Sequence, residues 1–287
     1  MKPGRFDYHA PGTVDEAVGL LAAHAESAKV LAGGQSLVPM MSLRLATFEH
    51  LVDLNGVAGL ASIERSNGDL RIGALVRQAT AEHDPTVAAA APLMARALPH
   101  IGHFQIRNRG TIGGSIAHAD PASELPAVAL ALDATLEAAG PGGRRSIPAS
   151  EFFESTWQTN LRDDEVLTAV VLPVWEATSG FAVEEVARRH GDFAICGAAC
   201  GVTVRGERVT RAAIALFGVA PTPLRASAAE AALVAAGTGA ELAEVARQAA
   251  APLVPNDDLH ATGAYRKQVI VTVVRRALAR ALQEACS

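Results

Sequence analysis

Cysteine and positive charge are scarce in this chain of 287 residues. Its three cysteines, Cys196, Cys200 and Cys286, are too few for a disulfide framework, and they cannot supply the four thiolates of an iron–sulfur cluster. Two of them lie in an apolar run, residues 193–204, where we expect small buried strand residues. Lysine and arginine total 25 against 30 acidic residues, so the chain lacks the basic surface that nucleic acid requires.

Long apolar runs are missing as well. No stretch of about 18 uncharged apolar residues is present that could span a membrane. Residues 1–7 contain no apolar segment of the kind found in a secretory signal, so we expect a cytoplasmic protein. Apolar residues nevertheless make up 49% of the chain, which is enough for a folded core, and the length suits two or three small domains.

Two common kinds of functional site are not indicated. His100 and His103 are three residues apart, but no carboxylate or third histidine lies at ligand spacing, so we expect no metal site. His118 lies inside a glycine-rich segment, where contact with a cofactor or a capping role is the better interpretation. No Gly-x-Ser-x-Gly elbow occurs, so no Ser–His–Asp triad is predicted and no catalytic residue is assigned.

Residues 1–176 alternate predicted helices with short strands. Thr13 and Glu16 have capping-box spacing, and the apolar stripe after them predicts a helix over residues 14–24. Further elements are expected as helices over 39–45, 81–90, 92–101 and 124–132, as strands over 30–32, 51–54 and 165–172, and as a hairpin around 66–69. This pattern indicates a mixed α/β unit.

The pattern changes near residues 173–180. Three strand-like runs follow, residues 181–187, 194–204 and 212–219, with a hairpin turn predicted at 205–207. Helical, Ala-rich sequence fills residues 226–251, and an apolar stripe predicts a long helix over 265–285. Residues 177–287 are therefore expected to form a smaller α+β domain, an antiparallel sheet with helices.

Two glycine pairs carry the chemistry of the first region. Gly33 and Gly34 follow a predicted strand and precede a predicted helix, where backbone N–H groups can converge on an anion. Gly113 and Gly114 form a second pair, flanked by hydroxyl side chains. Neither segment has the spacing of a Walker or Rossmann loop. An isolated pair is most often a tight turn with positive φ, whereas two pairs of like chemistry favour a dinucleotide with two phosphates.

The longer segments around these glycines resemble a known family. Residues 31–37 (LAGGQSL) and 107–126 (RNRGTIGGSIAHADPASELP) are similar to the two FAD signatures of the molybdenum hydroxylases, which include the carbon monoxide dehydrogenase and xanthine dehydrogenase types. The resemblance is to the separate medium flavoprotein subunit and extends over the whole chain. Residues 191–194 (GDFA) and 216–222 (LFGVAPT) look like its C-terminal domain.

The resemblance implies a fold and a set of partners. The fold is α+β: a vanillyl-alcohol-oxidase (PCMH)-type FAD-binding domain over residues 1–176, with two α/β subdomains of about 1–55 and 56–176, followed by a C-terminal domain over 177–287. FAD would bind this chain. A large subunit would carry the molybdopterin cofactor, where substrate is oxidised, and a small subunit would carry two 2Fe–2S clusters. The three chains would form a heterotrimer that dimerises to a heterohexamer, and electrons would pass through the clusters to the FAD and on to an acceptor.

The same resemblance implies the cofactor-binding residues. They lie along both glycine segments and at a few positions farther along the chain, and are Val30, Leu31, Ala32, Gly33, Gly34, Gln35, Ser36, Leu37, Ile101, Thr111, Ile112, Gly113, Gly114, Ser115, His118, Asp120, Glu124, Leu167, Glu185 and Phe193. Three of them keep a plainer interpretation beside this one: Asp120 as a turn acid, Glu124 as a solvated first-turn acid and Leu167 as strand core.

Several positions depart from the family pattern. Gln35 and Ser115 stand where relatives often have His and Asn. Glu185 stands where the family often has Lys close to the flavin, and Phe193 where some relatives have Tyr beside the ring. These last two changes concern redox tuning and the choice of acceptor, and not FAD binding itself.

Two other functions stay open at this point. A stand-alone flavin oxidoreductase of similar fold would need its own substrate pocket, and no acid–base pair for one is evident in the sequence. A scaffold that has lost FAD is disfavoured by the intact glycines of both segments. The substrate pocket would lie on another chain, so carbon monoxide, an aldehyde, a purine and another N-heterocycle all remain candidates.

Overall fold

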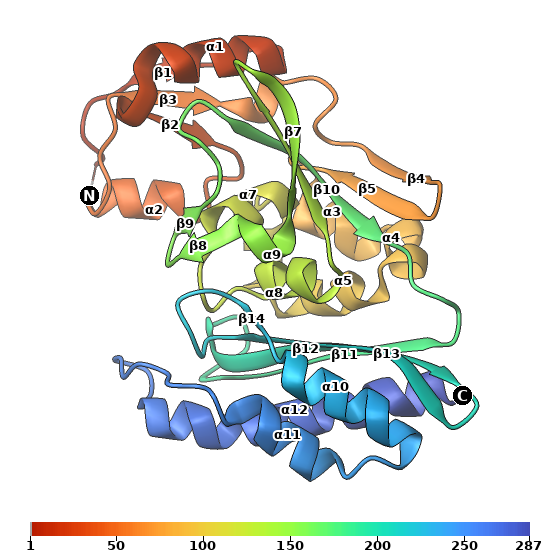
Figure 1. The fold of residues 1–287 in the computed structure, drawn as a ribbon. Helices are drawn as coiled ribbons and strands as arrows, with labels where there is room; N and C mark the ends of the chain where they lie inside the picture. The colour runs from red at the N-terminus through yellow and green to blue at the C-terminus, as the bar shows by residue number, and fades with distance from the viewer. Residues whose placement is uncertain (1) are drawn as a thin grey trace.

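Three main sheets follow one another along the chain (Figure 1). The computed structural model describes residues 2–287. The first sheet has three strands, the second five and the third four, and a short two-stranded ribbon accompanies the second. This arrangement confirms the predicted α+β fold, with an antiparallel sheet in the C-terminal part.

The first sheet is parallel, in the order β1 (Asp7–His9), β3 (His50–Asp53) and β2 (Ala28–Leu31). Helix α1 (Val14–His24) has the predicted bounds, and the Thr13 hydroxyl caps it by accepting from Glu16 N at 3.1 Å. Its apolar stripe is buried beside residues of both the first and the second sheet. The other elements here are η1 (Ala25–Ser27), α2 (Leu37–Ser42) and η2 (Leu54–Gly56).

The second sheet is antiparallel, and its strands in spatial order are β4 (Ile63–Ser66), β5 (Asp69–Gly73), β10 (Val166–Pro173), β6 (Thr135–Gly140) and β7 (Gly143–Pro148). The 66–69 hairpin was predicted, whereas the β6–β7 hairpin was not. The short elements around this sheet are α3 (Gln78–His83), α4 (Pro85–Ala90), α5 (Pro92–Ala97), η3 (Leu98–His100), α6 (Phe104–Arg107), α7 (Ile112–His118), α8 (Glu124–Ala131), α9 (Ala149–Phe152), β8 (Phe153–Ser155) and β9 (Gln158–Thr159).

Prolines and glycines divide helices that were expected to be continuous. The predicted helix over 81–90 is two helices, because Pro85 starts α4 and Asp84 caps it by accepting from Thr86 N and Val87 N. The predicted helix over 226–251 is also interrupted, here by a glycine. It consists of α10 (Ser227–Ala236), η4 (Gly237–Gly239) and α11 (Leu242–Ala250), and Gly237 has a φ of +69° at the break.

The third sheet is antiparallel in the order β11 (Ser179–Ala187), β12 (Ala194–Arg205), β13 (Arg208–Phe217) and β14 (Leu224–Arg225). The turn between β12 and β13 lies where it was predicted, and Gly206 has a φ of +61° in it. The long C-terminal helix α12 spans Gly263–Ala285. No helix among residues 2–287 combines the length and apolar character needed to cross a bilayer.

The third sheet is covered on both faces, as Figure 1 shows. Alternate residues of β11 point to opposite faces of the third sheet. Phe181 and Val183 pack into the core that contains the second sheet, whereas Ala182 packs into the core formed with α10 to α12. The C-terminal part therefore shares a core with the part of the chain that precedes it. The exact boundaries at residues 55 and 176 stay a prediction.

Candidate functional site

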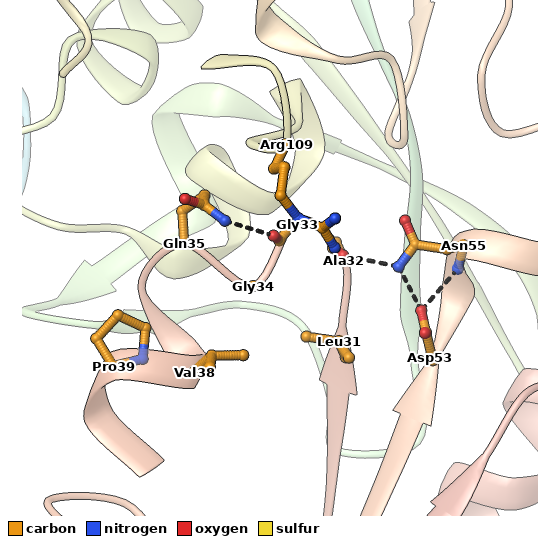
Figure 2. Close-up of a pocket in the computed structure, with 10 residues that line it drawn as sticks. All are labelled: Leu31, Ala32, Gly33, Gly34, Gln35, Val38, Pro39, Asp53, Asn55 and Arg109. Carbon is orange, nitrogen blue, oxygen red and sulfur yellow. Dashed lines mark hydrogen bonds between the residues drawn. The ribbon is translucent and has the colours of Figure 1, made fainter. Parts of the chain in front are cut away.

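A cleft of about 330 Å³ opens beside the first glycine segment (Figure 2). It lies where β2 ends and α2 begins, and the ends of β3 and α6 complete it. Its lining consists of Leu31, Ala32, Gly33, Gly34, Gln35, Val38, Pro39, Asp53, Asn55 and Arg109. Five of these were predicted from the sequence, and the other five come from α2, from the end of β3 and from the loop before the second glycine pair.

The first glycine segment presents free backbone donors to this cleft. Within residues 2–287, the N–H groups of Gly33, Gly34 and Gln35 donate to no protein acceptor. Gly34 has a φ of +73°, which suits a turn that aims successive N–H groups to one side. The Gln35 side chain donates from Nε2 to Gly33 O at 3.1 Å and so fixes the turn (Figure 2). An anion with several oxygens would satisfy these donors.

Gly33 is required because another backbone segment lies against it. A Cβ at this position would lie 2.4 Å from Arg109 O and 2.8 Å from Gly110 Cα. A Cβ on Gly114 would lie 3.5 Å from the Ala32 side chain, so the two glycine segments are neighbours in space. Their proximity places the Arg109 side chain in the cleft lining, where its cation would face a bound diphosphate.

The second glycine segment does not offer the free backbone N–H groups that the sequence predicted for it. Gly113 and Gly114 lie in the first turn of α7 and have no positive φ. Their N–H groups are already used, because Gly113 N donates to Ala74 O at 2.9 Å and Gly114 N to Thr111 Oγ1 at 3.0 Å. A Cβ on Gly113 would lie 2.4 Å from Ala74 Cβ. These glycines therefore allow close packing, and only the first segment offers a row of free amides.

Arg77 connects two of the residues that line the cleft, and no sequence motif predicted this role. Its guanidinium donates to Asn55 Oδ1 at 2.6 Å and also to Arg109 O. Asn55 in turn donates from Nδ2 to Ala32 O at 2.9 Å. Burial lowers the pKa of Arg77, and the nearby Arg109 cation lowers it further. Arg77 thus joins the end of β3 to the loop that carries Arg109.

Asp53 places a carboxylate at the rim of the same cleft. Its Oδ1 accepts from Asn55 N at 2.9 Å, and its Oδ2 accepts from the Tyr8 hydroxyl at 2.5 Å. The hydrogen bond to Asp53 raises the pKa of Tyr8, so the phenol stays protonated. A carboxylate in this position can also accept from hydroxyl or amine groups of a nucleotide.

A second polar group lies where the third sheet meets the short helices around the second sheet. His100 Nδ1 is 3.3 Å from Glu185 Oε1, and the Glu185 side chain is 9% exposed. Its other oxygen, Oε2, is buried and has no partner among the described residues. Glu124, at the start of α8, is also buried, and burial together with the Glu185 charge raises its pKa to about 8. An unpaired buried acceptor beside a protonated carboxyl is a strongly polar spot in an otherwise apolar junction.

The remaining predicted residues lie in different environments. Asp120 accepts from Ala122 N and from Trp157 Nε1, and the Trp157 ring stacks on His118. Phe193 is exposed and free to cover a planar ligand. Leu167 and Ile112 lie inside the core, whereas the partly exposed positions among the rest are Val30, Ser36, Leu37, Ile101 and Ser115. Whether each contacts FAD stays a prediction.

His100, His103 and His118, which the sequence analysis considered as metal ligands, each contact a different residue. His100 pairs with Glu185, His103 stacks on His190, and His118 stacks on Trp157. The structure therefore does not assemble them into one ligand set.

The cleft fits the phosphate part of a dinucleotide. Free amides and the Arg109 side chain supply anion-binding groups, and a Cβ would fill the approach at Gly33. Its volume lies within the usual range for small-molecule sites of about 300–1,000 Å³.

Comparison with known proteins identifies the family of this chain. A family described as the FAD binding domain in molybdopterin dehydrogenase matches residues 4–175, and the CO dehydrogenase flavoprotein C-terminal domain matches residues 181–281. The alpha subunit of a 6-hydroxypseudooxynicotine dehydrogenase complex from Paenarthrobacter nicotinovorans is 42% identical over 99% of this chain and 97% of its own length. The carbon monoxide dehydrogenase medium chain of Hydrogenophaga pseudoflava is 40% identical over 97% of both chains.

A solved structure shows the same fold. Carbon monoxide dehydrogenase from Hydrogenophaga pseudoflava, in a form that lacks the Mo-pyranopterin moiety of the molybdenum cofactor, superposes with a TM-score of 0.95 at 42% identity and covers 99% of each chain. The predicted family, the FAD cofactor and the oxidoreductase class are thereby confirmed. This chain belongs to the FAD-binding medium subunits of the molybdenum hydroxylase family, the group that includes the carbon monoxide dehydrogenase and xanthine dehydrogenase types.

Proposed function

We propose that this chain receives electrons from two 2Fe–2S clusters of a small partner subunit and delivers them to an external acceptor, after substrate is oxidised at a molybdopterin cofactor on a large partner subunit. The three chains form a heterotrimer, which dimerises to a heterohexamer in the cytoplasm. When bound, FAD supplies the two-electron redox chemistry. The observation that carries this proposal is the cleft with its three free backbone amides.

The residues of this chain divide the work of holding the cofactor. The amides of Gly33, Gly34 and Gln35 and the Arg109 side chain bind the diphosphate, and Asp53 accepts from a nucleotide hydroxyl or amine. The other proposed contacts, which include Glu124, Glu185 and Phe193, surround the rest of the cofactor. They orient it and exclude water from one side of the ring.

The cysteines support the placement of the iron–sulfur clusters on another chain. Cys196 and Cys200 are buried in β12, and burial raises the pKa of the Cys196 thiol to about 12 and that of Cys200 higher still. Cluster ligands must be thiolates, which these environments disfavour. Cys286 is exposed and is the next-to-last residue of the chain.

The choice of substrate belongs to the partner that carries molybdenum. Two relatives of similar identity to this chain, 42% and 40%, are named for 6-hydroxypseudooxynicotine and for carbon monoxide, which are chemically unrelated. Medium subunits of about equal similarity to this chain are thus named for chemically unrelated substrates, so similarity of this subunit does not indicate the substrate. The sequence of the large subunit would identify the substrate class.

The test compares the isolated chain with the assembled complex. We expect the chain produced alone to hold one FAD and neither iron nor molybdenum, and its flavin absorbance to stay constant when organic substrates are added. Co-production with the large and small subunits should give a complex whose flavin bleaches on addition of substrate. Stoichiometric iron in the isolated chain, or bleaching of its flavin by an organic substrate without partners, would refute the proposal in favour of a stand-alone oxidoreductase.

A further inference from the structure

Three histidines from three separate elements meet beside the first sheet. His9 ends β1, His24 ends α1 and His50 begins β3. One ring nitrogen from each lies within 4.8 Å of the other two, and all three residues are partly buried. They are far apart in the sequence, so no spacing motif revealed them.

The sheet register explains why they share one side. β1 and β3 are parallel, with Asp7 opposite His50 and His9 opposite Val52, so these four side chains point to the same face. Helix α1 covers that face, since its buried residues share a core with Val52. The end of α1 then brings His24 over the two strand histidines, and the His24 and His50 rings stack with centroids 3.6 Å apart.

The distances suit coordination of a metal ion once the His24 ring, which is stacked on His50, rotates so that its in-plane lone pair faces the same point as the other two. His9 Nε2 and His50 Nδ1 are 3.1 Å apart. Two imidazole nitrogens bound to one tetrahedral zinc, each at about 2.0–2.1 Å, lie about 3.3 Å apart. Among the described residues, the three rings have no protein hydrogen-bond partner except this mutual contact between His9 and His50. No other protein group therefore competes with a metal ion for these ring nitrogens.

Two further features favour a cation here. The Asp7 carboxylate lies 3.9 Å from His50 Nδ1 and is largely exposed, so it can move to become a fourth ligand. The carbonyl end of α1 also points its negative dipole end toward His24. Imidazole nitrogens with one carboxylate or water form a common shell for zinc and similar ions.

We propose that His9, His24 and His50 bind one divalent transition-metal ion of the zinc class, with Asp7 or water as the fourth ligand. The ion would tie α1 to both β1 and β3 and so stabilise the first unit. It lies apart from the cofactor cleft, because Tyr8, the neighbour of His9 in β1, points to the opposite face and donates to Asp53. FAD occupancy should therefore be independent of the metal.

The experiment uses the FAD-loaded chain after treatment with a chelator. We expect calorimetric titration with Zn²⁺ to give one saturable site per chain, and Zn²⁺ to raise the Tm by a few degrees. His24→Gln and His9→Gln should each weaken binding by at least about tenfold, because each removes a ligand. His83→Gln is the matched control, because His83 is exposed and ends α3 as His24 ends α1.

Titration with Co²⁺ gives a second readout, since an intense visible band indicates tetrahedral coordination by nitrogen ligands. It should appear in the wild type and in His83→Gln and be lost in His24→Gln. The proposal is overturned if Zn²⁺ shows no saturable site, or if His9→Gln and His24→Gln bind it within about twofold of the wild type. The cluster is then only a packing of three imidazole rings, two of which are hydrogen-bonded to each other. The flavin absorbance of every variant reports that it is folded.

Discussion

His100 Nδ1 lies 3.3 Å from Glu185 Oε1, and this pair connects the FAD-binding part to the third sheet. Arg188 and Arg189 are the nearest cations along the chain, yet Glu185 pairs with His100. Residues alternate along β11, so Glu184 points toward α12 and pairs with Arg280, whereas Glu185 points the other way, toward His100 of η3. The Glu185 hydrogen bond raises the pKa of His100.

Replacing Gly33 should abolish FAD binding. In Gly33→Ala the new Cβ would meet Arg109 O at 2.4 Å, which forces the two glycine segments apart and disperses the three free amides. Purified Gly33→Ala should contain less than a tenth of the flavin of the wild type, by absorbance near 450 nm. Gly19→Ala is the control, because open space surrounds that position. Full flavin content in Gly33→Ala would mean that the cleft is misassigned.

Removing the Arg77 side chain should weaken FAD binding without unfolding the protein. Arg77→Ala loses the charged donor that holds Asn55 and the Arg109 carbonyl in place. Hydrogen bonds to charged groups contribute about 1.5–3 kcal/mol, so the Kd for FAD should rise about tenfold or more. Fluorescence titration of the FAD-depleted protein measures this. Arg144→Ala, at an exposed position of β7, should leave the Kd unchanged, and an equal effect in both variants would contradict the assignment.

The FAD should be held without a covalent bond. None of the ten residues lining the cleft is a His, Cys or Tyr that could form a flavin bond, and Gln35 stands at the position where a His is common in the family. Acid precipitation should release all the yellow colour into the supernatant. Flavin that stays in the pellet after washing would disprove this prediction.

The stability of the cofactor-free protein should fall as the pH rises, because of Glu124. Its pKa is about 8 in the folded chain against 4.5 for a free side chain. Between these values the unfolded chain has lost the proton while the folded chain keeps it, so the free energy of unfolding falls by up to about 1.4 kcal/mol per pH unit and levels off above pH 8. The raised pKa of His100 adds a loss of the same sign.

Glu124→Gln should remove the Glu124 part of this dependence. Urea unfolding between about pH 5 and pH 8 should show that the free energy of unfolding of the variant increases relative to that of the wild type as the pH rises. Glu207→Gln, at an exposed turn, is the control and should run parallel to the wild type. Parallel curves for Glu124→Gln and the wild type would show that Glu124 is ionised in the folded protein.

The charge at position 185 should set the flavin potential, if Glu185 lies beside the ring as the family resemblance implies. Reduction adds negative charge to the ring, which a carboxylate opposes and a cation stabilises. Two unit charges about 6 Å apart interact by roughly 2–3 kcal/mol at an effective dielectric near 20. If about 1–2 kcal/mol survives pairing with His100, Glu185→Lys should raise the two-electron midpoint potential by about 20–40 mV.

Potentiometric titration at one pH and salt concentration measures this shift. Glu184→Gln is the matched control, because Glu184 is the next residue but faces α12. An unchanged or lowered midpoint in Glu185→Lys would show that position 185 does not face the ring.

The sequence by itself determined the family, the fold class and the first glycine segment. Helix α1 was predicted residue for residue, because a capping Thr and an apolar stripe are local signals. The turn at Gly206 was likewise predicted from its turn residues, and the long helix α12 from its apolar periodicity. Local patterns failed where one proline or glycine divided a helical stretch, as at Pro85 and Gly237.

Only the tertiary structure decided how distant segments use these residues. It showed that Gly113 serves packing against Ala74 while Gly33 lies against Arg109 and borders a row of free amides, although the two glycine pairs look alike in sequence. It also brought Arg77 to Asn55, and three histidines to one side of the first sheet. Such contacts join residues that are far apart in the sequence. They depend on the strand register and on the face of the sheet on which each side chain lies. Those properties follow from the packing of the whole chain, because a local sequence window contains neither partner strand.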